Sequence, residues 1–131
     1  MVATPSAGAR HADCIVTGML EGVGAGAERY MNLLSARQKI VSSNIANADT
    51  PGYKTKDIDF QTELANQMQG TQTPNPIEVS GLKTKNDGNN VDIDRESRLL
   101  AENDLRFAVA SAMARSDIQS IKSAIEDSKT S

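Results

Sequence analysis

Apolar residues recur at alternating intervals of three and four residues between positions 31 and 48. This spacing places them along one stripe of an α-helix and is typical of a helix that packs lengthwise against another helix. We therefore predict a first long helix over about residues 21–48, with Leu34, Val41 and Ile45 as its packing residues. The full stripe, which has one polar interruption, comprises Met31, Leu34, Gln38, Val41, Ile45 and Ala48.

A second apolar stripe begins near residue 93, and neither glycine nor proline occurs beyond that point. The same reasoning predicts a second long helix over about residues 94–127, with Leu100, Phe107, Ile118 and Ile121 as candidate packing residues. The stripe comprises Ile93, Leu100, Phe107, Ala114, Ile118, Ile121 and Ile125.

A rise of 1.5 Å per residue makes each predicted helix roughly 40 to 45 Å long. Because the two helices have similar lengths, they can pack side by side as a hairpin. The predicted fold class is mainly α: two long terminal helices pack as an antiparallel, coiled-coil-like hairpin. Residues 19–131 are expected to form one domain, because a chain of 131 residues does not comfortably hold two cores. Residues 1–18 mix proline, glycine, charged and small residues, and we expect a flexible leader there.

The segment between the helices, residues 49–91, lacks a sustained periodicity and is expected to be irregular. Alternation of charged and apolar residues predicts a short strand over 54–60, and a second is predicted over 77–79. Residues 61–69 predict a short helix. Asp-Gly-Asn-Asn at 87–90 predicts a tight turn before the second helix.

The stretch Thr50-Pro51-Gly52-Tyr53 predicts a type II turn, because proline presets the dihedral of the second position and glycine accepts a positive φ at the third. Pro51 also disfavours helical geometry in the preceding residue, so the first helix is expected to end by about Asp49. Polar side chains in its last turns are expected to cap free backbone groups. The candidate turn residues are Asn44, Asn47, Asp49, Thr50, Pro51, Gly52 and Tyr53.

Composition limits the function. The chain has no Trp, two Tyr and two Phe, so it has few large side chains to fill a compact core. This favours long thin helices that complete their burial against neighbouring subunits. A formal net charge of -3 without any basic run argues against a nucleic-acid partner. The longest apolar runs are too short for a membrane span or a cleaved secretory signal.

Patterns that could bind a small molecule fail on spacing. The glycines at positions 22, 24 and 26 do not follow a predicted strand. A dinucleotide-binding loop spaces its glycines G-x-G-x-x-G, whereas here the third glycine stands one position too early. Aligning Gly88 with the glycine of a calcium loop puts Lys83 and Lys85 at ligand positions. His11 is the only histidine, so histidine-based catalysis or metal binding has no plausible arrangement. We expect no enzyme activity, catalytic residue, metal, cofactor or small-molecule substrate.

The amino-acid sequence of the turn gives information beyond its geometry. Residues 46–54, followed by Asp-Ile-Asp-Phe at 57–60, resemble the N-terminal motif of bacterial flagellar rod and hook proteins. Residues 90–96 and 100–107 resemble the C-terminal signature of the same family. The likeness covers about residues 30–125, and the short length resembles the proximal rod members.

The resemblance implies a structural subunit of the proximal rod in the flagellar basal body, which helps to transmit torque from the motor to the hook and filament. Its implied partners are copies of itself, other rod proteins, the adaptor at the rod base, the membrane ring and the export gate. It also implies export through the flagellar type III apparatus without a cleaved signal peptide, and a final location in the rod that spans the periplasm.

One alternative from a different class stays open. A soluble helical adaptor or flagellar export chaperone would share the paired helices, but it should form a stable, discrete dimer in solution. A rod subunit is expected to be a weakly folded monomer whose helices become ordered on assembly.

Overall fold

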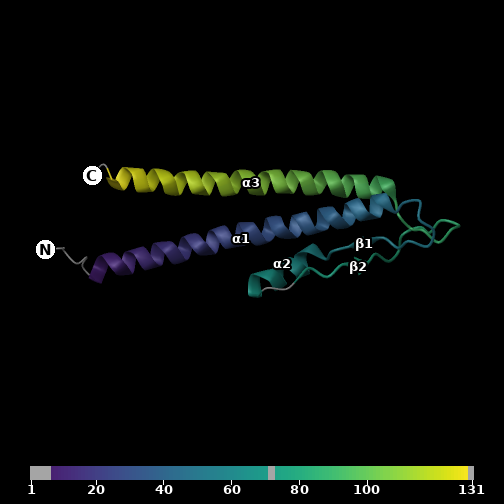
Figure 1. The fold of residues 1–131 in the computed structure, drawn as a ribbon, viewed down its shortest axis with the longest axis horizontal. Helices are drawn as coiled ribbons and strands as arrows, with labels where there is room; N and C mark the ends of the chain where they lie inside the picture. Colours follow the sequence, from purple (N-terminus) through teal and green to yellow (C-terminus); the bar gives the residue numbers. More distant parts are fainter. Residues whose placement is uncertain (1–6, 71–72, 130–131) are drawn as a thin grey trace.

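The computed structural model describes residues 7–70 and 73–129. Two long helices, α1 (Ala7–Ala46) and α3 (Ile93–Lys129), dominate it. Figure 1 shows them running antiparallel, close together where the middle segment joins them and further apart towards the two termini. The middle segment folds back along α1, which therefore lies between it and α3 in this view. The predicted fold class, a mainly helical hairpin with an irregular middle, is confirmed.

The ends of the long helices differ from those predicted. Helix α1 begins at Ala7 instead of near residue 21, so residues 7–18 extend the helix, and residues 1–6 of the expected leader lie outside the described residues. Alanine, which has the highest helix propensity, occupies positions 7, 9 and 12. The helix ends at Ala46, and α3 runs two residues beyond residue 127.

The middle segment contains the predicted short elements, but the strands are shorter than predicted and the helix begins one residue earlier. Strands β1 (Lys56–Asp57) and β2 (Ile77–Glu78) pair antiparallel, with Lys56 opposite Glu78. The strand predicted over 54–60 ends early because the carboxylate of Asp59 accepts a hydrogen bond from the Thr62 amide and caps α2 (Phe60–Gln69). Phe60 therefore begins a helix instead of ending a strand.

The start of α3 is fixed by a side-chain cap. Asp92 Oδ1 accepts hydrogen bonds from the amides of Asp94, at 3.0 Å, and Arg95, at 3.3 Å. These are orphan donors of the first turn, and a carboxylate near them also favours the helix dipole. The tight turn before this cap has Gly88 at a φ of 83°.

Burial is concentrated in the half of the hairpin next to the middle segment, where α1 is covered on two sides. A T-shaped pair of Tyr30 and Phe60, with ring centres 5.4 Å apart, closes α2 onto α1. Among the described residues, buried polar side chains are more numerous than buried apolar ones. The buried apolar residues are Leu33, Leu34, Val41, Ala48, Ile58 and Val91. The buried polar residues are Asn44, Thr55, Asp57, Gln67, Asn89, Asn90, Glu96 and Asn103.

Candidate functional site

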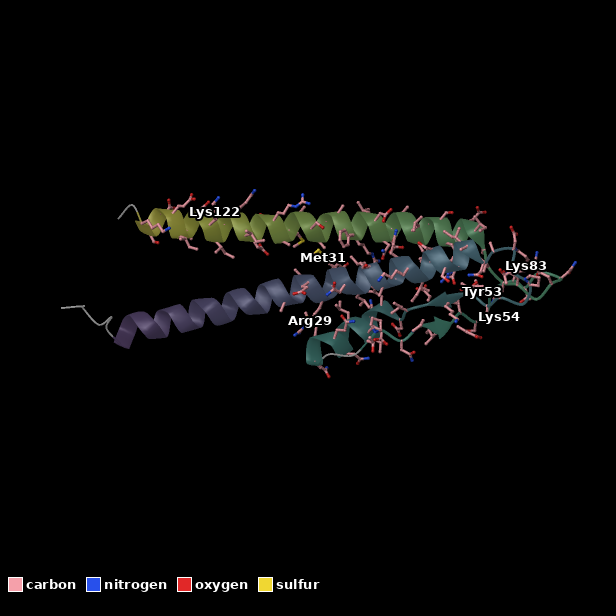
Figure 2. All side chains as sticks on the ribbon, viewed as in Figure 1. Arg29, Met31, Tyr53, Lys54, Lys83 and Lys122 are labelled. Atoms are coloured by element: carbon pink, nitrogen blue, oxygen red, sulfur yellow. The ribbon has the colours of Figure 1, made fainter. Side chains whose placement is uncertain are left out.

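The turn that ends α1 lies at the tip of the molecule, where Tyr53 and Lys54 are found (Figure 2). Gly52 has a φ of 74°, and the Tyr53 amide donates to the Thr50 carbonyl at 3.3 Å, as expected for glycine in the third position of a type II turn. The Gly52 amide donates to the Asp87 carbonyl at 3.0 Å. A Cβ on Gly88 would lie 3.4 Å from the Gly52 Cα, so the two turns pack glycine against glycine.

Asn89 caps the end of α1, although it lies in the loop before α3 and is far from α1 in sequence. Its buried side chain donates to the carbonyls of Asn47, at 2.9 Å, and Thr50, at 2.8 Å, and accepts from the Val91 amide at 2.7 Å. Lys85 Nζ donates to the Ala48 carbonyl at 3.0 Å. The last carbonyls of α1, those of Ser43, Asn44 and Ile45, accept from the amides of Asn47 and Ala48. The carbonyls that follow the helix accept instead from the loop that leads into α3.

The polar residues predicted to cap the helix have three different environments. Asn47 does cap locally, since its Nδ2 donates to the Ser43 carbonyl at 2.8 Å and its Oδ1 accepts from Thr50 Oγ1 at 3.2 Å. Asp49 and Pro51 are exposed. Asn44 is not a cap, because it is fully buried and its hydrogen bonds leave the helix.

Asn44 joins three elements through four hydrogen bonds. Its Nδ2 donates to the Lys56 carbonyl at 2.7 Å and to Glu96 Oε2 at 2.9 Å. Its Oδ1 accepts from the Lys56 amide at 3.1 Å and the Tyr53 hydroxyl at 3.2 Å. Every hydrogen-bonding position of this amide is used, so the contact fixes how α1, β1 and α3 meet.

Asp57 is the centre of an ion-pair network beside Asn44. Arg37 holds it with two bonds, Nε to Oδ1 at 2.9 Å and Nη2 to Oδ2 at 3.1 Å, and Arg95 Nη2 reaches Oδ2 at 3.0 Å. Arg95 also pairs with Glu96, whose side chain is completely buried. Two positive and two negative charges thus balance where α1, β1 and α3 converge. We call Arg37, Asn44, Asp57, Arg95 and Glu96 the polar cluster.

Electrostatics agree with this geometry. Burial alone would raise the pKa of Asp57, but hydrogen bonds from Arg37, from the Ile58 amide and from Arg95 outweigh it and hold the pKa below its ordinary value. The hydrogen bond to Asp57 raises the pKa of Arg37 further above its already high value, against the opposing effect of burial. Both groups are therefore ionised at neutral pH.

Sequence reasoning missed most of the polar cluster. Asn44 was among the candidate turn residues, but the carboxylates of Asp57 and Glu96, which are buried, were not among the candidate site residues. Strict alternation would place Asp57 on the face opposite Ile58, but both residues are buried, whereas Lys56 is exposed. The buried charge of Asp57 therefore needs a partner. Nothing in the sequence identified Arg37 and Arg95 as that partner.

The predicted packing residues divide into buried and exposed groups. Leu34 and Val41 are fully buried, whereas Phe107 is 43% exposed and Ile118 is 64% exposed. The residues of intermediate exposure are Ile45, Leu100 and Ile121. The residues of α3 that are themselves fully enclosed are the polar Glu96 and Asn103. Large apolar side chains of α3 thus remain on the surface, and the most exposed of them are Leu105, Val109, Met113, Ile118 and Ile125.

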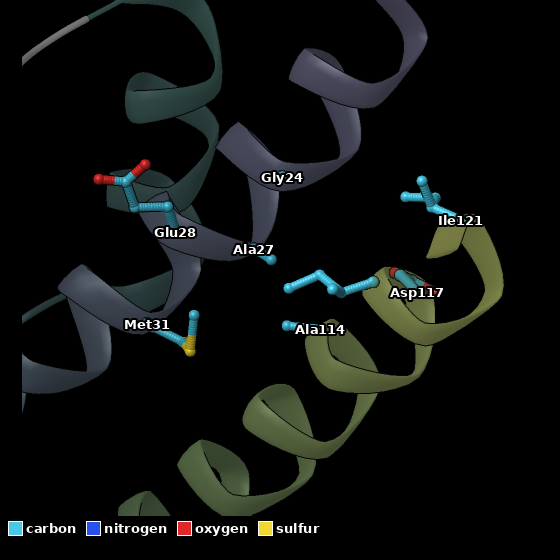
Figure 3. A pocket seen from close by; sticks show the side chains of 8 residues that line it. Gly24, Ala27, Glu28, Met31, Ala114, Asp117 and Ile121 are labelled. Atoms are coloured by element: carbon cyan, nitrogen blue, oxygen red, sulfur yellow. The ribbon is translucent and has the colours of Figure 1, made fainter. Parts of the chain in front are cut away.

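The diverging halves of α1 and α3 leave two apolar grooves between them. One has a volume of about 400 Å³, and Figure 3 shows Ala27 and Met31 of α1 across from Ala114 and Asp117 of α3. The other, of about 460 Å³, is lined by residues that include Tyr30, Val109 and Met113. Among the lining residues, Gly24, Ala27 and Ala114 are small and leave room between the helices.

The part of the chain that the structure describes contains no group of three or more His, Cys, Asp or Glu side chains that could hold a metal ion. Among the helices described, none has an apolar stretch long enough to cross a membrane.

Comparisons with known proteins identify the family. A profile described as "Flagella basal body rod protein" matches residues 27–54, which span the end of α1 and the turn. The chain is 30% identical to the flagellar basal body rod protein FlgB of Escherichia coli, over 76% of this chain and 89% of that protein. It is 31% identical to FlgB of Yersinia enterocolitica, over 76% and 90%, and 32% identical to FlgB of Borrelia hermsii, over 63% and 80%. The chain therefore belongs to the FlgB family of flagellar basal body rod proteins.

Proposed function

We propose that this chain is a structural subunit of the proximal rod of the bacterial flagellar basal body and helps to transmit torque from the motor to the hook and filament. Membership of the FlgB family supports a role in the basal body rod. The proposal includes self-association and contact with other rod proteins, with the adaptor at the rod base, with the membrane ring and with the export gate. It also includes export by the flagellar type III apparatus without signal cleavage, and no enzymatic role.

One observation supports an assembly role above the others: α3 leaves apolar side chains uncovered on more than one side. Leu105 is 66% exposed and Met113 is 65% exposed, and they lie on a different side of the helix from Ile118. A helix with an apolar surface this wide needs partners on several sides. A subunit enclosed by neighbours in a rod would have them.

The polar cluster suggests how torque passes through one subunit. The exposed helix faces contact neighbours, whereas Asn44 and Asp57 fix the angle at which α1, β1 and α3 meet. Buried hydrogen bonds and ion pairs are directional, unlike apolar contacts, so they resist a change in that angle. Load applied to one helix is then carried to the other without bending at the tip.

The experiment is deletion of the gene, followed by imaging of isolated basal bodies and complementation with variants. We expect the deletion to remove rods and retain rings. Gly52→Val should not complement, because valine is strained at a φ of 74°. Gly70→Val is the matched control, since Gly70 has an extended φ of 169° and no atom within 4 Å of its added Cβ. Complete rods in the deletion strain would refute the proposal.

The alternative of an adaptor or export chaperone makes a different prediction. It requires a discrete dimer that stays the same over a wide range of protein concentration. A rod subunit should instead form larger species as the concentration rises. Sedimentation velocity on the purified chain separates the two.

A further inference from the structure

One side of α3 carries an acidic cleft, and the same side carries a row of basic residues further along. With 3.6 residues per turn, Asp104, Phe107, Arg115, Lys122 and Lys129 all fall within a sector of roughly 80° around the helix. The cleft and the basic row therefore face the same direction but lie at different heights along one rod-like element.

The cleft has a volume of about 200 Å³ and opens between α1 and α3. Asp104 Oδ1 accepts from Gln38 Nε2 at 3.1 Å, which fixes the Gln38 amide so that its Oε1 accepts from Asn103 Nδ2 at 2.8 Å. Asn103 Nδ2 also donates to the Leu34 carbonyl at 2.9 Å. The lining residues are Leu34, Ser35, Gln38, Asn103, Asp104 and Phe107.

This network leaves one buried acceptor unsatisfied. Asn103 is 3% exposed, and among the described residues nothing donates a hydrogen bond to its Oδ1. Exchanging the amide oxygen and nitrogen of Asn103 by a 180° rotation would not help, because Nδ2 already donates to the Leu34 carbonyl and to Gln38 Oε1. A buried acceptor without a donor costs free energy, so an incoming donor would be favoured at this position.

The side chains that line the cleft favour a positively charged group as the incoming hydrogen-bond donor. Asp104 supplies a carboxylate, Phe107, which is 43% exposed, supplies an aromatic ring, and Asn103 lines the cleft with its unsatisfied carbonyl oxygen buried. Carboxylate and carbonyl oxygens accept hydrogen bonds from ammonium or guanidinium groups, and the face of an aromatic ring attracts them.

Basic side chains of this kind occur on the far half of the same helix. Arg115, Lys122 and Lys129 are exposed and alternate with Ile118 and Ile125 at intervals of three and four residues. Figure 2 shows Lys122 on this half of α3. An arginine or lysine of the row could enter the cleft while an adjacent isoleucine packs against the Phe107 ring.

The row cannot reach the cleft of its own chain. Arg115 is its nearest member, and eleven residues of continuous helix place it roughly 16 Å from Asp104 along the axis. The complementary side chain must therefore come from another molecule.

We propose that the cleft around Asn103 and Asp104 binds the basic row of a second copy of this chain, in a staggered head-to-tail contact between α3 helices. This inference rests on the proposed self-association. Because the contact joins two different surfaces, each copy keeps a free cleft or a free row, and the contact can continue from subunit to subunit.

The test is charge reversal in the purified full chain, followed by sedimentation velocity at about 50 mM and about 500 mM NaCl. Asp104→Arg should weaken self-association on the order of tenfold at the lower salt concentration, and so should combined reversal of the row to Asp. A chain carrying both changes should associate again, because the charges are exchanged. Glu126→Arg is the control, since it reverses a charge on the same helix and leaves the row basic.

Four results overturn the inference: a wild-type chain that stays monomeric, an Asp104→Arg chain that associates normally, a double variant without recovery, or closed dimers that do not grow with concentration. The first and the last also contradict the proposed growth of larger species with concentration, whereas the two results on variants concern this contact alone. None of the four bears on whether the rod is missing from cells that lack the gene. Failure of this contact is therefore distinguishable from failure of the proposed function.

Discussion

Replacing Asp57 by asparagine tests the polar cluster with almost no change in shape. The asparagine can keep its one oxygen for Arg37 Nε, but it then presents an amide nitrogen to the Nη2 donors of Arg37 and Arg95. Arg37 and Arg95 then lose the charge that compensates their own, although Glu96 still neutralises Arg95 in part.

The structure sets the expected magnitude. Removing one partner of a fully buried ion pair costs about 3 to 5 kcal/mol. Here the arginine side chains retain 13% and 20% of their exposure, so water replaces part of the lost interaction. We expect Asp57→Asn to lower the free energy of unfolding by about 2 to 3 kcal/mol.

The assay is urea unfolding near neutral pH, followed by far-UV circular dichroism. Asp59→Asn is the matched control, because it removes the same charge two residues away and asparagine caps α2 about as well as aspartate. We expect the control to remain within about 0.5 kcal/mol of wild type. If Asp57→Asn were equally close to wild type, the polar cluster would not hold the elements together.

The pH dependence has a defined sign. The pKa of Asp57 is lower in the folded protein than its ordinary value of 3.8, so its contribution is complete above that value. It is lost as the pH falls below 3.8 and through the lowered pKa. The difference in unfolding free energy between wild type and Asp57→Asn should therefore shrink in that range, and a difference that grew with acid would contradict the assignment.

Three further substitutions test other parts of the account. Asn89→Ala removes the donors to two carbonyls at the end of α1 and should lower the free energy of unfolding by about 1 to 3 kcal/mol, as measured by urea unfolding. Leu34→Ala leaves a cavity at a fully buried position and should cost about 2 to 5 kcal/mol in the same assay. Met113→Lys, at a side chain that is 65% exposed, should change that stability by less than about 0.5 kcal/mol yet reduce swimming in a complementation assay. Loss of stability in that last variant would mean that the α3 surface is already buried within one chain.

Local sequence rules predicted the parts of the fold that depend on nearby residues. The spacing of Leu34 and Val41 predicted the face of α1 that is buried, and Gly52 predicted a turn with a positive φ. Periodicity was less informative for α3. It identified Ile118 by its apolar character, but the helix packs on α1 through Glu96 and Asn103 on a neighbouring side.

The polar cluster could not be predicted, because its pairs join residues far apart in sequence. Arg37 and Asp57 are 20 residues apart, and Asn44 and Glu96 are 52 apart. A single sequence contains no information about which acid meets which base once several of each are present. The early start of α1 was missed for a different reason: the single proline of the predicted leader, Pro5, precedes the helix, and alanines at 7, 9 and 12 favour helix.

Hydrogen exchange measured along the chain, first in the purified subunit and then in isolated basal bodies, shows whether α3 completes its packing only in the rod. We predict that amides around Asn44, Asp57 and Glu96 exchange slowly in both, whereas those of α3 beyond Phe107 exchange rapidly in the free subunit and become protected in the rod. Equal protection of that half of α3 before and after assembly would contradict it, because its apolar surface would then need no neighbour.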